Sequence, residues 1–103
     1  HEQQLIDHLI DQIKQIPGAT IYGNHAEKHG ALSFNLDRID AYDAGMILDK
    51  MGIAVRTGTH CAEPLMQHFG INGTIRASIG MYNTKEEINK LIDALYKVQA
   101  MLL

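Results

Sequence analysis

The sequence predicts a small α/β (α+β) domain in which helices pack on one small antiparallel or mixed sheet. Two observations lead to this fold class. Apolar residues recur at spacings of three and four near both ends of the chain, as in amphipathic helices. Between these ends lie short apolar runs of strand length, separated by polar segments that contain Gly or Pro. At 103 residues, the chain is expected to form a single domain, residues 1–103.

The first half of the chain predicts a helix, two strands and a second helix. A helix over 3–16 ends at Pro17-Gly18, because proline cannot continue the backbone hydrogen bonds. Its apolar face contains Leu5, Ile6, Leu9, Ile10, Ile13 and Ile16. Strands follow over 19–22 and 31–36. Asp40 then stands where a helix N-cap belongs. That helix has an apolar face and a glycine stop, which are formed by Ala44, Ile47, Leu48, Met51 and Gly52.

In the second half of the chain, 53–55 is predicted to be a short buried strand and 56–64 a loop. A short helix is expected over 63–69, with Pro64 in its first turn. A further strand over 74–81 places Arg76 and Ser78 on one face, with Ile75, Ala77 and Ile79 on the other. The capping box Thr84-Lys85-Glu86-Glu87 then starts a long helix.

Composition excludes several classes of protein. Nine basic and twelve acidic residues give a net charge of −3, and no basic face is evident that would bind a nucleic acid. No apolar run reaches the length of a membrane span. The single cysteine cannot form an internal disulfide, which indicates a reducing, cytoplasmic location. The start at His1, within a helical pattern and without Met, indicates a piece of a longer chain.

Cys61 is the candidate nucleophile. Its neighbours from Arg56 to Pro64 are mostly polar or flexible, so it does not belong to an apolar run. Nearby positive groups such as Arg56 and His60 favour the thiolate, which is the reactive form. A lone cysteine is, however, commonly a small buried apolar residue. From the residues alone, a reactive thiol and an inert one stand about even.

Arg76 and Arg56 are candidates for holding a carboxylate. The planar guanidinium can grip a carboxylate through two parallel hydrogen bonds. The alternative for each is a surface arginine that contributes little, and Arg56 has the further option of anchoring the cysteine loop. The six histidines do not form a metal-ligand pattern, so no metal site is predicted.

The stretch from Gly52 to Met66 resembles the active-site loop of group II cysteine desulfurases and their selenocysteine lyase relatives, within the class V aminotransferase superfamily. The resemblance continues through Arg76-Ala77-Ser78 and the run from Tyr82 to Ile88. It also includes Ser33-Phe34-Asn35, and so extends over most of the chain. It implies the small C-terminal domain of the type I pyridoxal-phosphate fold.

The resemblance also implies a site and a reaction. Cys61 corresponds to the thiol that takes sulfur from L-cysteine as a persulfide while L-alanine is released, for iron–sulfur cluster assembly or other sulfur transfer. Arg76 corresponds to the arginine that holds the substrate carboxylate, and Arg56 to one that lines the site. His60 and Thr59 belong to the same loop. Thr59 is a departure, because many family members have a second histidine there.

The resemblance implies that the rest of the machinery lies outside the chain. The large pyridoxal-phosphate domain is missing, so this chain is expected to bind no cofactor and to be inactive alone. A homodimer partner and a sulfur-acceptor protein are implied for the full-length enzyme. Three alternatives stay open. They are a selenocysteine lyase, another class V aminotransferase-type enzyme, and a non-enzymatic α/β binding module with an inert Cys61.

Overall fold

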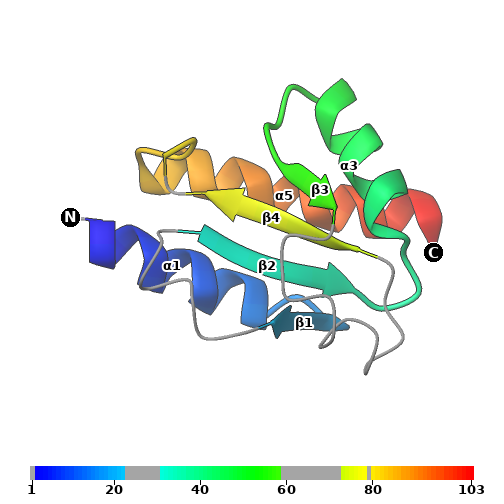
Figure 1. The fold of residues 1–103 in the computed structure, drawn as a ribbon, viewed down its shortest axis with the longest axis horizontal. Coiled ribbons are helices and arrows are strands. Elements are labelled where there is room, and N and C mark those ends of the chain that lie inside the picture. Colours follow the sequence, from blue (N-terminus) through cyan, green and yellow to red (C-terminus); the bar gives the residue numbers. More distant parts are fainter. Residues whose placement is uncertain (1, 23–30, 59–72, 79) are drawn as a thin grey trace.

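The computed structural model describes residues 2–22, 31–58, 73–78 and 80–103. Within these ranges three helices accompany four strands (Figure 1). In chain order the elements are α1 (Glu2–Lys14), β1 (Ala19–Tyr22), β2 (Ala31–Leu36), α3 (Ala41–Lys50), β3 (Arg56–Gly58), β4 (Thr74–Ser78) and α5 (Lys85–Leu102).

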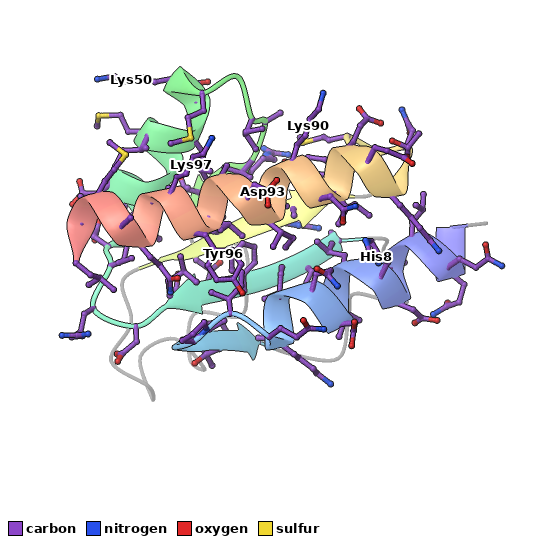
Figure 2. The ribbon with its side chains drawn as sticks, turned by 180° about the vertical axis from the view of Figure 1, so that it is seen from behind. His8, Lys50, Lys90, Asp93, Tyr96 and Lys97 are labelled. Atoms are coloured by element: carbon purple, nitrogen blue, oxygen red, sulfur yellow. The ribbon has the colours of Figure 1, made fainter. Side chains whose placement is uncertain are left out.

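The four strands form one antiparallel sheet in the order β1-β2-β4-β3. Strands β2 and β4 are therefore central, and β1 and β3 are the edges. Helices α1 and α5 lie over one face of this sheet, as the view from behind shows (Figure 2). Helix α3 lies against α5, β3 and β4 at one end of the same layer. The fold is thus a two-layer arrangement of helices on an antiparallel sheet.

The core fills the space between the two layers. Alternation along β2 and β4 directs Leu32, Phe34, Leu36, Ile75 and Ala77 toward the helices, and all five are buried. They join one cluster with apolar residues of the helices, namely Leu5, Ile6, Leu9, Ile13, Ala41, Ala44, Leu48, Ile88, Leu91, Ile92, Ala94, Leu95 and Val98. None of the described helices is long and apolar enough to cross a membrane.

Two helix starts are capped as predicted. The Asp40 carboxylate accepts hydrogen bonds from the amides of Tyr42 and Asp43, at 3.0 and 3.1 Å. At α5, the Thr84 hydroxyl accepts a hydrogen bond from the Glu87 amide at 3.2 Å. The Glu87 carboxylate reaches back to the backbone amide of Asn83 at 3.0 Å, one residue before the N-cap amide that a standard capping box would engage.

Several predicted boundaries need correction. Strands 19–22 and 31–36 are confirmed, and the first helix ends at Lys14. The strand predicted over 53–55 is wrong, since the strand is Arg56–Gly58, inside the predicted loop. The last strand ends at Ser78, with a turn where Met81 donates a hydrogen bond to the Ser78 carbonyl. The predicted helix over 63–69 lies outside the described residues.

The shift of β3 has a clear physical cause. The amide of Ile53 donates to the carbonyl of Leu48 at the end of α3, so this residue still belongs to the helix terminus. Pairing with β4 begins at Arg56, although β4 itself continues to Ser78. The carbonyl of Ala54 accepts a hydrogen bond from the Tyr82 hydroxyl instead. Pairing with β4 therefore decides where the strand starts, and the apolar run 53–55 does not.

Helix α3 is packed closely on β3 at Gly45. A Cβ atom at this position would lie 2.4 Å from Thr57 Cγ2. We expect Gly45→Ala to lower the free energy of unfolding by about 1–2 kcal/mol, because overpacking outweighs the roughly 1 kcal/mol that alanine gains in a helix. Urea unfolding measures this change. In a Thr57→Ser background the clashing methyl is absent, and the same substitution should become neutral or stabilising. Stabilisation in the wild-type background would contradict the close packing.

Candidate functional site

The face of the sheet opposite the helices, here called the open face, carries mainly polar side chains. Strand alternation places on it Thr20 and Tyr22 of β1, Ala31, Ser33 and Asn35 of β2, Arg56 of β3, and Thr74, Arg76 and Ser78 of β4. None of the described helices covers this face (Figures 1 and 2). The sequence therefore builds a sheet with one apolar and one polar side.

A row of four side chains crosses the open face from edge to edge. The strand register pairs Tyr22 with Ser33, Ser33 with Arg76, and Arg76 with Arg56. Directly opposed residues on antiparallel strands have their Cβ atoms about 4.5–5.5 Å apart and share one face. The two arginines, which are twenty positions apart in sequence, are thus immediate neighbours.

The electrostatics of this arginine pair are unusual for a purely structural feature. Arg56 is exposed and Arg76 is half-buried. Neither forms an ion pair or hydrogen bond that would offset the other's charge within the described residues. Like charges directly opposite each other destabilise a sheet. An anion between the guanidinium groups would remove that penalty, and a carboxylate matches their planar donors.

Hydrogen bonds fix the two strand ends that flank residues 59–72. The side-chain amide of Asn35 donates a hydrogen bond from Nδ2 to the Gly73 carbonyl at 2.8 Å, which ties β2 to the start of β4. The hydroxyl of Thr74, which is fully buried, donates to the Gly58 carbonyl at 3.4 Å. Gly58 and Thr74 are also register partners. The chain therefore leaves β3 and enters β4 at one place, next to the arginine pair.

Tyr82 holds the chain just before β3. Its ring is buried in the core, and its hydroxyl donates a hydrogen bond to the carbonyl of Ala54. Burial, followed by the negative charge of Glu87, raises the pKa of Tyr82 from 10.0 to about 12. The phenol therefore remains a protonated donor at neutral pH.

The structure brings together two of the five predicted site residues. Arg56 and Arg76 share the open face, as Arg76 and Ser78 were predicted to share one face of their strand. Cys61, His60 and Thr59 lie outside the described residues, so their predicted roles stay predictions. Cys61 follows the last residue of β3, Gly58, by three positions.

Sequence reasoning missed the supporting residues of this site. The polar alternation of Ser33 and Asn35 within 31–36 was a usable signal for the open face. Tyr82 gave no such signal, because its hydrogen-bond partner lies 28 positions away in the chain.

The arginine pair does not line the cavity that lies along β1 and β2. This cavity of about 490 Å³ opens at the far end of β1 and β2, and Thr20, Asn35 and Arg38 are among its lining residues. Within the part of the chain that the structure describes, no group of three or more His, Cys, Asp or Glu side chains could hold a metal ion.

Comparisons with known proteins give a consistent result. The family model described as "Aminotransferase class-V" matches residues 1–91. A cysteine desulfurase from Pectobacterium carotovorum is 45% identical over 102 residues, which is 99% of this chain and 25% of that protein. A cysteine desulfurase from Salmonella newport gives the same identity and the same coverage.

Solved structures show the same similarity. The cysteine desulfurase CsdA (S-sulfonic acid) from Escherichia coli superposes with a TM-score of 0.83 at 29% identity, covering 99% of this chain and 25% of that one. An apo cysteine desulfurase from Thermococcus onnurineus NA1 gives 0.79 at 35% identity, covering 94% and 24%. The predicted fold class is confirmed, and the chain spans about a quarter of the length of the curated relatives it matches.

Proposed function

Because the chain belongs to the aminotransferase class-V family, we propose that it is the C-terminal small domain of a pyridoxal-phosphate-dependent cysteine desulfurase. The observation that carries this proposal is the arginine pair on the open face, which lies beside the strand end that leads to Cys61. Its charge suits the carboxylate of an amino-acid substrate. The 45% identity to cysteine desulfurases over nearly the whole chain supports the same substrate class.

Arg76 is proposed to bind the substrate α-carboxylate, with Arg56 beside it. Arg76 lies on a central strand and is half-buried, so its side chain is better restrained than that of Arg56 on the edge. A restrained guanidinium loses less conformational freedom when it binds. Arg56 adds positive charge on the side from which the chain continues toward Cys61.

The proposed reaction transfers one sulfur atom to Cys61. The Cys61 thiolate attacks the sulfur of L-cysteine, so that a sulfur–sulfur bond forms and the substrate carbon–sulfur bond breaks. The electron pair of that bond stays with carbon, which takes up a proton to give L-alanine. Cys61 is left as a persulfide. The two sulfurs are oxidised while the carbon is reduced, so no further oxidant is needed.

The described residues are better suited to bind the substrate of this reaction than to bind its cofactor. Pyridoxal phosphate, when bound, supplies an electron sink that makes bonds at the substrate carbon labile. It would be held through a lysine amine. Among the described lysines, Lys14, Lys50, Lys85, Lys90 and Lys97 are all exposed on helices behind the opposite face, and Lys28 lies outside the described residues. We therefore propose that the cofactor is held by the remaining three-quarters of the enzyme. The homodimer contact and the site for a sulfur-acceptor protein belong to the same proposal.

Alanine release by the full-length enzyme tests this function. We expect the enzyme to convert L-cysteine to L-alanine and to gain the mass of one sulfur atom on Cys61. Cys61→Ser should lower alanine release on the order of a thousandfold or more, as the loss of a nucleophile does. The same variant should keep its thermal stability and its bound cofactor. The 103-residue chain alone should release no alanine.

The outcomes separate the alternatives. Undiminished turnover of cysteine by Cys61→Ser would contradict the role of the thiol. Release of alanine from L-selenocysteine but not from L-cysteine would indicate a selenocysteine lyase instead. No turnover of either substrate by the cofactor-loaded wild type would overturn the proposed function.

A further inference from the structure

Strand β3 is held weakly by its own pairing, although it carries one member of the arginine pair. It contains only Arg56–Gly58, lies at the edge of the sheet and, among the described strands, pairs only with β4. Short edge strands have few ladder hydrogen bonds and open easily. Contacts from outside the sheet must therefore contribute to the position of Arg56.

One of these contacts comes from Tyr82. The segment before β3 is irregular, and Ala54 is exposed. The carbonyl of Ala54 nevertheless accepts the hydrogen bond of the Tyr82 hydroxyl, which reaches it from the core. Ala54 precedes Arg56 by two positions, so this bond fixes the backbone immediately before the strand.

Tyr82 is itself well restrained, since it lies between two hydrogen-bonded groups. On one side, the Met81 amide donates to the Ser78 carbonyl at 2.9 Å, which joins it to the end of β4. On the other side, the Asn83 amide donates to the Glu87 carboxylate at 3.0 Å, which joins it to the start of α5. A rigid anchor can transmit position to its partner, whereas a mobile one cannot.

The geometry thus connects the two strands that carry the arginines by a second route. Strand β4 bears Arg76, the turn after β4 bears Tyr82, and Tyr82 holds the segment that leads to Arg56. Tyr82 is 5% exposed and belongs to the core on the helix side. It cannot touch a substrate on the open face, so its influence must pass through the backbone of 54–56.

We propose that Tyr82 is a positioning residue for substrate recognition: its hydroxyl holds Ala54 so that Arg56 faces the same carboxylate as Arg76. This inference rests on the proposed function, because it assigns the arginine pair to substrate. The residue does not take part in the chemical step. Its loss should therefore weaken substrate binding while the turnover of bound substrate changes little.

Tyr82→Phe in the full-length enzyme tests the proposal, since it removes only the hydroxyl. We expect KM for L-cysteine to rise about three- to tenfold, with kcat within about twofold of wild type. In an Arg56→Ala background, the same substitution should change KM less than about twofold, because its effect acts through Arg56. Tyr96→Phe is the matched control. It removes the hydroxyl of an exposed tyrosine on α5 that does not contact Ala54, and KM should not change.

Hydrogen exchange gives a readout that does not depend on activity. Amides over 53–58 should exchange faster in Tyr82→Phe than in wild type, while those of α1 stay unchanged. Equal exchange in the two proteins overturns the positioning role, and so does a KM increase that persists in full without Arg56. Failure of the proposed function looks different, because the wild type would then release no alanine.

Discussion

Replacing Arg76 by alanine in the full-length enzyme should raise KM for L-cysteine about a hundredfold. A bidentate pair between a guanidinium and a carboxylate contains two charge-assisted hydrogen bonds, each contributing about 1.5–3 kcal/mol before competing costs. A net loss of about 2.7 kcal/mol corresponds to that factor. Arg76→Lys keeps the charge but loses the planar fork, so its effect should be about tenfold. Steady-state kinetics measure both variants.

The same substitution, which should weaken substrate binding, should not lower the stability of the fold. Because Arg76 lies directly opposite Arg56, its removal relieves the repulsion between like charges. We expect the free energy of unfolding to stay constant or to rise by about 0.2–1 kcal/mol. A fall in affinity together with retained or increased stability separates loss of binding from damage to the fold.

Arg38→Ala is the matched control for this experiment. Arg38 is an exposed arginine beyond the end of β2 and takes no part in the arginine pair. Its removal should leave KM unchanged. An unchanged KM in Arg76→Ala would contradict the assignment of the open face to the substrate carboxylate, whatever reaction the enzyme catalyses.

Phe34→Ala should cause the largest loss of stability in the chain. Phe34 is completely buried on the central strand β2 and faces the helices. Deleting a buried aromatic ring costs about 3–5 kcal/mol, from lost burial and from the cavity that remains. The whole free energy of unfolding of a natural domain is only about 5–15 kcal/mol. The variant should therefore show a markedly lower urea midpoint.

Two further variants calibrate that result. Phe34→Leu keeps most of the volume and should cost less than about 1.5 kcal/mol. Met46→Ala changes an apolar residue that is 59% exposed, and it should alter stability by less than about 0.5 kcal/mol. A loss in Phe34→Ala no greater than that in Met46→Ala would contradict the central place of Phe34 in the core.

Local signals in the sequence predicted most elements correctly. The cap at Asp40 and the capping box at Thr84 place both helix starts, because their hydrogen bonds involve residues two or three positions away. Strands 19–22 and 31–36 were equally well predicted from their bounding polar and glycine-containing segments. The apolar run 53–55 misled, since apolar composition alone does not distinguish a strand from the segment that leads into one.

For the candidate site, too, the sequence gives local properties, whereas contacts between distant segments come only from the structure. The sequence by itself determined which side chains have the right chemistry, namely Cys61, Arg76 and Arg56, and which faces of the helices and strands are apolar. Only the tertiary structure decided that Arg56 and Arg76 oppose each other and that Tyr82 holds Ala54. Both depend on register and packing between segments about twenty or more positions apart, and strand register is set by pairing across the sheet.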